Sequence, residues 1–287
     1  TEAQKNIGQI NSRIFWIIFF LCFQYGVYFD AKYLEPNWIQ VTQVEIKNKH
    51  FPTNLQKLKI VHISDPHIKK YGWREKHLVR IMKSLNPDLI LITGDFISEK
   101  RYLKALCNVM ADMKAKRGIY GVIGDNDYAV NIGELKEALA EAGVTILDNE
   151  SVRIPLENSG LWLIGLTNTA VEGIVQMATR KVTLSEPKIL LTHYPESIDL
   201  GYITPENTDL VLTGGTHGAQ VGSLFAHIFS YKEGYAGLIM KYVSGLYKVN
   251  GVPMYVSRGI GTIGDAQEDT IRFFCRPEVT LIKLKQK

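Results

Sequence analysis

The segment LKIVHISDPH, residues 58–67, shows the pattern that decides the fold of this chain. Its apolar, β-branched run indicates a buried strand, and an aspartate and a histidine follow where that strand ends. The same order, an apolar run and then polar residues, returns four more times: at ITGD (92–95), IGDND (123–127), LTHYP (191–195) and LTGGTH (212–217). The chain therefore repeats one plan, in which each strand carries polar side chains at its outgoing end.

Amphipathic segments lie between these strands. The spacing of apolar residues predicts helices at residues 73–85, 99–117 and 132–143, and the last of these ends on a glycine suited to a helix C-terminus. Strands are also predicted at 88–93, 118–123, 160–166, 188–192, 209–213, 253–257, 271–274 and 278–284. This alternation predicts an α/β fold with a more β-rich second half.

The polar residues at the strand ends form a candidate ligand set. They are Asp65, His67, Asp95, Asp125, His193 and His217. In open α/β sheets, ligand sites form beyond the carboxyl ends of the strands. Aspartate and histidine without thiolate suit Mn, Fe or Zn. Each residue alone also fits an ordinary turn or a hydrogen-bonded histidine, the interpretation we give to His62, His77 and His227, but their joint occurrence predicts a metal site.

The acidic turn GDND poses a separate problem. Asp125 and Asp127 lie two residues apart, and like charges this close raise each other's pKa. The turn is therefore costly unless a cation or hydrogen-bond donors neutralise it. A metal site and an ordinary hydrogen-bonded turn are the two interpretations.

An apolar segment near the N-terminus indicates a membrane anchor. Residues 14–29, within RIFWIIFFLCFQYGVYFD, carry no charge, and a bilayer span needs about 20 residues. Trp16, Tyr25 and Tyr28 have the rings favoured at membrane interfaces. A signal peptide and a buried core helix are the alternatives. Basic residues lie on both sides of the segment, so its orientation is open, and EPNW (35–38) is a candidate hinge.

The composition is that of a globular protein. The apolar content is 46%, the charged content is 22%, and the formal net charge is only +4. We find no dense basic stripe with interleaved aromatic residues, and we expect no nucleic-acid partner. Cys22, Cys107 and Cys275 lie far apart and predict neither a disulfide framework nor a zinc–thiolate site.

The strand-end motifs resemble those of a known family. DPH at 65, GD at 94, GDND at 124, TH at 192 and GGTHGAQ at 214 resemble, in order, the motifs of calcineurin-like metallophosphoesterases. The resemblance spans roughly residues 58–284. The segments EPNW, YVSRGIGT (255–262) and FFCRPEVTLIKL (273–284) resemble a membrane-anchored bacterial subgroup, which includes phosphodiesterases and UDP-2,3-diacylglucosamine hydrolases of lipid A biosynthesis. The implied fold is a two-sheet β-sandwich flanked by helices, with two bridged metals.

The resemblance also implies roles for the six residues. Asp65, His67 and His217 would hold the first metal, Asp95 would bridge, and His193 with Asp125 would hold the second. The expected ions are two Mn²⁺, with Zn²⁺ or Fe as alternatives. Paired metals can clamp a phosphoryl group and activate a water, so no protein nucleophile is required.

Three residues depart from the family pattern. Asp125 stands where the family has an asparagine ligand, and Asn126 replaces the histidine that serves the leaving group. Gly215 replaces the first histidine of the last motif and so deletes a ligand. Asp127 matches the acidic residue behind the loop. The lost ligand implies a weakened second metal site, an effect that the added charge of Asp125 would partly offset. With the lost histidine, the departures imply a slow enzyme.

Residues 223–248 follow the last motif and are apolar and aromatic, with interspersed lysines. This composition predicts either a lipid-facing lid or a helix packed on the domain. Arg258 and Arg276 are candidates for contact with phosphate or for structural pairing.

These features together predict an N-terminal anchor with hinge at residues 1–36 and a metallophosphoesterase domain at 37–287. The expected function is metal-dependent hydrolysis of a phosphodiester or pyrophosphate, best exemplified by a UDP-2,3-diacylglucosamine-type lipid that releases UMP. The expected location is the bacterial inner membrane. The alternatives are a membrane-anchored pseudoenzyme that binds metal or phosphate, and a chain in which the substitutions were introduced deliberately.

Overall fold

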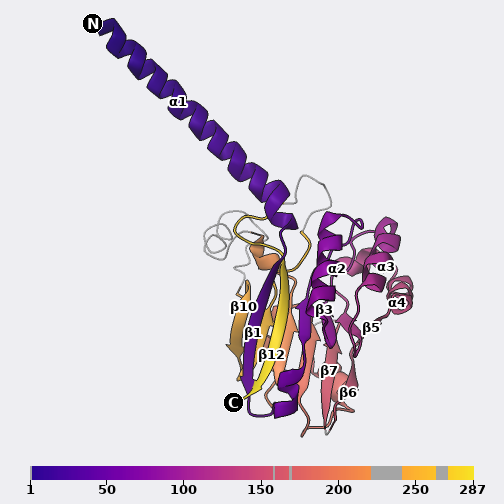
Figure 1. The fold of residues 1–287 in the computed structure, drawn as a ribbon. Helices are drawn as coiled ribbons and strands as arrows, with labels where there is room; N and C mark the ends of the chain where they lie inside the picture. Colours follow the sequence, from indigo (N-terminus) through magenta and orange to yellow (C-terminus); the bar gives the residue numbers. More distant parts are fainter. Residues whose placement is uncertain (1, 158, 168–169, 221–240, 263–270) are drawn as a thin grey trace.

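The computed structural model describes residues 2–157, 159–167, 170–220, 241–262 and 271–287, and side chains from residue 13 onward. Two six-stranded mixed sheets stack against each other, with helices on their outer faces (Figure 1). The predicted β-sandwich flanked by helices is confirmed. The more distant part of the predicted lid, residues 223–240, lies outside the described residues.

The first sheet carries the strands of the N-terminal half together with the last strand. In spatial order its strands are β1 (Gln40–Asn48), β12 (Glu278–Gln286), β2 (Ile60–Ile63), β3 (Leu89–Thr93), β4 (Ile119–Val122) and β5 (Val144–Ile146). The strands from β2 to β5 are parallel to one another. Their carboxyl ends therefore meet along one edge.

The second sheet is built in the same way. Its strands, in spatial order, are β10 (Gly245–Val249), β11 (Val252–Val256), β9 (Leu210–Thr213), β8 (Lys188–Thr192), β7 (Gly160–Leu166) and β6 (Glu150–Pro155). Strands β7, β8, β9 and β11 run parallel. The described end of the predicted lid, residues 241–248, is an irregular stretch at 241–244 followed by most of edge strand β10, so this part is neither a lid nor a helix.

Alternating side chains of the central strands enter two different cores. Leu89 and Leu91 of β3 pack between the sheets, whereas Ile90 and Ile92 pack under the helices α2 (Trp73–Leu85), α3 (Leu103–Asp112) and α4 (Ile132–Glu141). Helix α5 (Glu172–Thr179) covers the outer face of the second sheet. Because both faces are buried, these strands read as continuous apolar runs in the sequence.

Most predicted elements are present, and two predictions need correction. The helix predicted at 99–117 ends earlier, at Asp112, because Met113 adopts an extended backbone. The strand predicted at 271–274 is wrong: these residues form an irregular segment that contacts the stretch following the N-terminal helix. The buried guanidinium of Arg272 fixes that segment by donating to the carbonyls of Arg258, Gly259 and Cys275.

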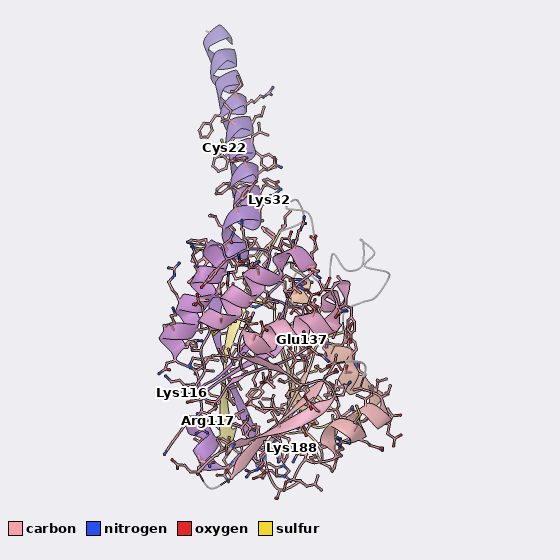
Figure 2. All side chains as sticks on the ribbon, turned by 90° about the vertical axis from the view of Figure 1, so that its right-hand side faces the viewer. Cys22, Lys32, Lys116, Arg117, Glu137 and Lys188 are labelled. Carbon is pink, nitrogen blue, oxygen red and sulfur yellow. The ribbon has the colours of Figure 1, made fainter. Side chains whose placement is uncertain are left out.

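Helix α1 (Glu2–Phe29) projects from the domain (Figures 1 and 2). The helical stretch Arg13–Asn37 is long and apolar enough to cross a membrane. Phe15 and Trp16 are each 61% exposed, so the alternative of a buried core helix is wrong. Length and composition fit both a membrane anchor and a signal sequence.

The base of α1 is tied to the domain through the EPNW turn. Glu35 begins a 3-10 helix and is buried. Its carboxylate accepts hydrogen bonds from the backbone N–H of Phe274 (2.9 Å) and of Cys275 (2.5 Å). The backbone N–H of Arg272 donates to the carbonyl of Ala31 at 2.9 Å. The segment before the sandwich is thus held at defined points.

His62 occupies the middle of the sandwich and has a structural role. Its Nε2 lies 2.9 Å from the hydroxyl of Thr93, and its ring packs edge-on against Tyr255. Burial lowers the pKa of His62 to about 4. The folded protein therefore holds this imidazole neutral in a pH range where the unfolded chain protonates it.

This difference predicts a specific acid sensitivity. Because the folded-state pKa of His62 is depressed, its contribution to stability is present above about pH 6.5 and is lost as pH falls toward 4, by about 3 kcal/mol in all. Replacing His62→Gln should therefore flatten the fall in unfolding free energy between pH 7 and pH 4.5. Urea denaturation of the full chain in detergent measures this, with His77→Gln as control. Equal pH slopes for His62→Gln and the parent chain would contradict the prediction.

Candidate metal centre

Five loops meet at the carboxyl ends of the parallel strands. The loops after β2, β3 and β4 carry Asp65, Asp95 and Asp125, and adjacent parallel register aligns those three strand ends. The loops after β8 and β9 bring His193 and His217 from the second sheet. The site therefore lies where the edges of both sheets meet.

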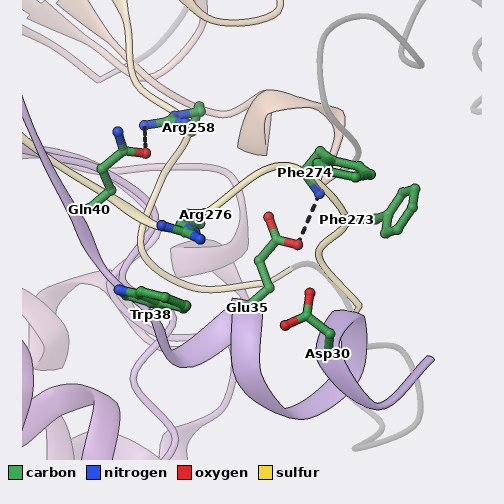
Figure 3. Close-up of a pocket in the computed structure, with 8 residues that line it drawn as sticks. All are labelled: Asp30, Glu35, Trp38, Gln40, Arg258, Phe273, Phe274 and Arg276. Atoms are coloured by element: carbon green, nitrogen blue, oxygen red, sulfur yellow. Dashed lines mark hydrogen bonds between the residues drawn. The ribbon is translucent and has the colours of Figure 1, made fainter. Parts of the chain in front are cut away.

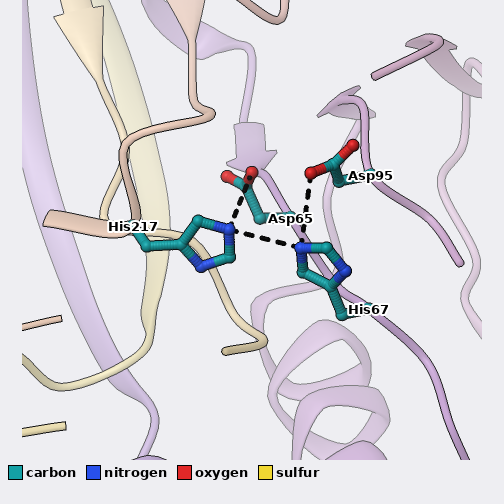
Figure 4. A group of neighbouring side chains, drawn as sticks. All are labelled: Asp65, His67, Asp95 and His217. Atoms are coloured by element: carbon teal, nitrogen blue, oxygen red, sulfur yellow. Dashed lines mark hydrogen bonds and ion pairs between the residues drawn. The ribbon is translucent and has the colours of Figure 1, made fainter. Parts of the chain in front are cut away.

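The first group of side chains consists of Asp65, His67, Asp95 and His217, all of them buried (Figure 4). The Nε2 atoms of His67 and His217 face each other at 3.2 Å. His67 Nε2 lies 3.3 Å from a carboxylate oxygen of Asp95, and His217 Nε2 lies 3.4 Å from one of Asp65. Two nitrogens and two carboxylates thus point at one small volume.

The second group consists of Asp95, Asp125 and His193. His193 Nε2 lies 3.0 Å from Asp125 and 3.6 Å from Asp95. The other ring nitrogen of His193 lies 2.8 Å from the carbonyl of Thr93, which fixes the ring. Asp125 is exposed, whereas its two partners are buried. This group is therefore more open than the first.

Asp95 belongs to both groups. Within each group, the candidate ligand atoms lie within 4.8 Å of one another, and one carboxylate completes both sets. Imidazole nitrogen and carboxylate oxygen are the donors that Mn, Fe and Zn accept in proteins. The residues present therefore fit a divalent metal. All six predicted residues are brought together, and their individual roles as ligands stay predictions.

The backbone at the first group is strained. Asp65, His67, Asp95 and His217 all have positive φ, between 39° and 55°. Non-glycine residues rarely adopt this conformation, which costs roughly 1–3 kcal/mol each and persists where the surroundings enforce it. Such strain clusters at functional sites. The loops hold these side chains toward one another at a cost in stability.

Neighbouring glycines allow the loops to approach closely. A Cβ atom at Gly124 would lie 2.2 Å from a carboxylate oxygen of Asp95, and one at Gly214 would lie 1.7 Å from the hydroxyl of Ser64. Neither position can carry a side chain without moving the loop beside it. Close packing of the loops thus explains why glycine occupies position 124 of the GD pair and position 214 of the GG pair.

Hydrogen bonds from backbone N–H groups stabilise the acidic turn GDND. Asp127 is fully buried and accepts from the backbone N–H of Gly124 (2.9 Å) and of Ile97 (3.1 Å). Burial, with a further contribution from the charge of Asp95, raises the pKa of Asp127 to about 7. Asp127 therefore supports the loop from behind, while Asp125 faces His193.

Asn126 turns toward Asp95. Its backbone N–H donates to one oxygen of Asp95 at 2.9 Å, and its side-chain amide donates to the other at 2.8 Å. Sequence reasoning placed Asn126 beside the substrate. No signal in the sequence indicated that it would orient the shared carboxylate.

Charges at the site act strongly on one another. Burial lowers the pKa of His193, but the hydrogen bond with Asp125 and the charges of Asp95 and Asp65 outweigh burial and raise it to about 10. Burial raises the pKa of Asp95, but His193, His67 and the amide of Asn126 bring it well below its usual range. In the metal-free protein, a proton on His193 therefore balances the carboxylates, and a metal bound at Nε2 must displace it.

The first group has a different balance. Burial raises the pKa of Asp65, and the charge of Asp95 adds to this effect. Burial lowers the pKa of His217 well below its usual value, with a further contribution from His67. A neutral His217 has a free lone pair to offer, which is the form that binds a metal.

Gly215 lies beside the second group. A Cβ atom built there would lie 3.1 Å from His193 Nε2. A histidine at this position would therefore begin next to the second group. Instead, the backbone N–H of Gly215 donates to both oxygens of Asp65, at 3.1 and 3.2 Å.

The His217 loop rests on the segment that joins α1. The thiol of Cys275 lies 3.4 Å from the carbonyls of both His217 and Gly218. The backbone N–H of the same cysteine donates to Glu35. A short series of contacts thus links the base of the N-terminal helix to a candidate metal ligand.

Comparison with known proteins identifies related sequences. The model of the calcineurin-like phosphoesterase superfamily domain matches residues 58–224. An uncharacterised metallophosphoesterase of Bacillus subtilis, YkoQ, is 28% identical over 252 residues, covering 84% of this chain and 89% of that protein. The phosphodiesterase YaeI of Escherichia coli is 26% identical over 264 residues, covering 88% and 90%.

Two further matches concern a vertebrate protein and a solved structure. A transmembrane protein with metallophosphoesterase domain from Danio rerio is 29% identical over 263 residues, covering 86% of this chain and 57% of that protein. The crystal structure of the protein TT1561 from Thermus thermophilus is similar with a TM-score of 0.48 and 13% identity, covering 71% and 90%.

The shared position of Asp95 predicts how metal content responds to substitution. Asp95→Asn should weaken binding at both groups by at least about tenfold, because one carboxylate serves both. Asp125→Asn should weaken binding only at the second group. Calorimetric titration with Mn²⁺, checked by elemental analysis, counts the ions. His77→Gln, a histidine in neither group, is the control. If Asp95→Asn binds Mn²⁺ like the parent chain, the proposed sharing is wrong.

Proposed function

The chain belongs to the calcineurin-like phosphoesterase superfamily, and we propose that it is a metal-dependent hydrolase of a phosphodiester or pyrophosphate bond. The observation that supports this proposal is the pair of side-chain groups joined by Asp95. This arrangement suits two divalent cations, with Mn²⁺ as the proposed ion. When bound, such a pair polarises the phosphoryl oxygens and lowers the pKa of a water molecule.

The protein's own residues orient the shared carboxylate. Asn126 donates to both oxygens of Asp95, and Asp127 fixes the turn that carries Asn126. Hydrogen bonds that orient a ligating carboxylate are worth about 10- to 100-fold in metal affinity or activity. We assign Asn126 to this positioning role.

The leaving group must depart without a proton from Asn126. An amide is not a proton donor of useful acidity, and the loss of a general acid costs about 10²- to 10⁴-fold in rate. A phosphate monoester, whose second pKa is about 6, leaves more readily than an alkoxide. We therefore favour a pyrophosphate bond, and release of a nucleoside monophosphate such as UMP.

A lipid-linked substrate is supported by the position of α1. The apolar stretch Arg13–Asn37 ends at Glu35 and its neighbours, which contact the segment behind the His217 loop. If this stretch crosses a membrane, as we propose, the site lies close to the lipid surface. A UDP-2,3-diacylglucosamine-type lipid in the bacterial inner membrane has the required combination of pyrophosphate and acyl chains.

One specific observation favours a second candidate function. The amide of Asn126 is turned to Asp95, and Gly215 offers no side chain to the second group. A chain with these two features could bind a metal or a phosphate without hydrolysing it. The second candidate is therefore a membrane-anchored binding protein that retains the fold.

Restoring both family residues separates the two functions. The double variant Asn126→His, Gly215→His should release UMP from UDP-2,3-diacylglucosamine at least about 10²-fold faster than the parent chain, because it regains a general acid and a ligand. The backbone N–H of residue 126 still donates to Asp95 in this variant. A histidine at position 215 would be strained, since φ there is +74°. The four residues of the first group already have positive φ without being glycine.

The assay uses the full chain with Mn²⁺ and includes bis(p-nitrophenyl) phosphate as a lipid-free diester. The same double variant carrying Asp95→Asn is the control and should remain inactive. If the double variant binds two ions and hydrolyses neither compound faster, the binding protein is favoured. Faster cleavage of the diester alone would retain the hydrolase and reject the lipid substrate.

A further inference from the structure

A cavity lies where the N-terminal helix meets the sandwich (Figure 3). Its volume is about 270 Å³. Its walls are formed by Asp30, Glu35, Trp38, Gln40, Arg258, Phe273, Phe274 and Arg276. None of the six candidate metal ligands lines it. The cavity is therefore separate from the metal centre, although one of its walls continues toward Cys275.

Among the described residues, no carboxylate forms an ion pair with Arg276. Its guanidinium centre lies 3.8 Å from the centre of the Trp38 ring, and the side chain is half-buried. Stacking on an aromatic face leaves the N–H groups at the edge of the guanidinium free to bind an anion. Their fork geometry matches two oxygens of a phosphate.

The other charged residues of the cavity have partners that fix them. Arg258 pairs with buried Glu278 at 3.3 Å and donates to Gln40 at 3.2 Å. The carboxylate of Glu35 is held by two backbone N–H groups. Arg258 thus adds positive potential at a fixed place, while Arg276 remains the donor available for a ligand.

The charge distribution limits the class of ligand. Asp30 and Glu35, on the segment that follows the helix, line the same cavity as the two arginines (Figure 3). These carboxylates disfavour a polyanion such as a nucleoside diphosphate. A single phosphodiester charge fits better. The volume is also smaller than the range of about 300–1,000 Å³ that is typical of pockets for drug-sized ligands.

The surroundings of the cavity point to a membrane surface. Tyr33 and Trp38 are each 52% exposed, and Phe274 is 69% exposed. All three lie at the base of a helix that is long and apolar enough to cross a membrane. Tyrosine and tryptophan are enriched at the level of the lipid headgroups. An anion that reaches this cavity from the membrane would be a headgroup phosphate.

We propose that this cavity binds the phosphate of a membrane phospholipid headgroup, with Arg276 as its principal donor. Phe274 and Trp38 lie beside the glycerol region of the lipid, and Arg258 contributes at the far wall. The site fixes the height of the domain relative to the bilayer. It rests on the proposed placement of α1 in a membrane, but it does not depend on hydrolysis of any substrate.

Counting bound lipids tests the site. The full chain in a neutral detergent, treated with a chelator so that turnover plays no part, is titrated with phosphatidylglycerol and followed by native mass spectrometry. Arg276→Gln should weaken the tightest lipid association by about tenfold or more, since it removes a charge-assisted pair of hydrogen bonds. Arg276→Lys should recover only part of the loss. Arg117→Gln, an exposed arginine at the end of the domain away from α1 (Figure 2), should have no effect.

Two further titrations define the ligand. A neutral diacyl glycolipid without phosphate should show no dependence on Arg276. Inorganic phosphate should compete only weakly, because it lacks the apolar part of a lipid. Equal lipid affinity for Arg276→Gln and the parent chain would overturn the proposal. Tight, Arg276-dependent binding of inorganic phosphate that phosphatidylglycerol does not displace would overturn the lipid assignment. The arginine variants are first checked for an unchanged near-UV spectrum. Trp38→Leu removes the stacking surface and should weaken lipid association as Arg276→Gln does. Because tryptophan itself contributes to the near-UV spectrum, the fold of that variant is checked by urea unfolding instead.

Discussion

A single buried carboxylate, that of Asp95, determines the organisation of the candidate metal centre. It lies between His67 and His193, which come from different sheets, and Asn126 directs both of its oxygens. Without a cation, it can be tolerated only because a protonated imidazole and hydrogen-bond donors surround it. The same position lets one residue serve two groups of ligands. The strained loops and the close glycines around it all serve to bring these partners within reach.

Much of this arrangement could be predicted from the sequence, for a physical reason. Parallel strands buried on both faces give long apolar runs, and the residues that end them must appear at one edge, so Asp65, Asp95 and His193 were found without a structure. The β-sandwich itself was expected from resemblance and is confirmed. The edge strands β1 and β10 and the irregular path of residues 271–274 depend on tertiary contacts that the local sequence pattern did not indicate.

The turn GDND shows where sequence reasoning stops. The spacing of Asp125 and Asp127 predicted that a cation or hydrogen-bond donors must neutralise them, and in the structure the two carboxylates have different partners. Asp127 is satisfied by backbone N–H groups, whereas Asp125 lies against His193. The direction of the Asn126 side chain could not be predicted, because an asparagine can face a substrate or a neighbouring carboxylate with equal ease. The contacts that these residues make therefore depend on packing rather than on motif alone.

The contacts between Glu35 and the backbone of Phe274 and Cys275 have a practical consequence for anyone who prepares this protein. Cutting the chain after the apolar stretch Arg13–Asn37, the usual way to obtain a detergent-free sample, would delete Glu35, the acceptor of two inward-facing amides. The thiol that lies under the carbonyl of His217 would lose its support at the same time. A shortened version that starts beyond Glu35 should therefore be judged as an altered protein, and a start point at or before Ala31 keeps the native junction intact.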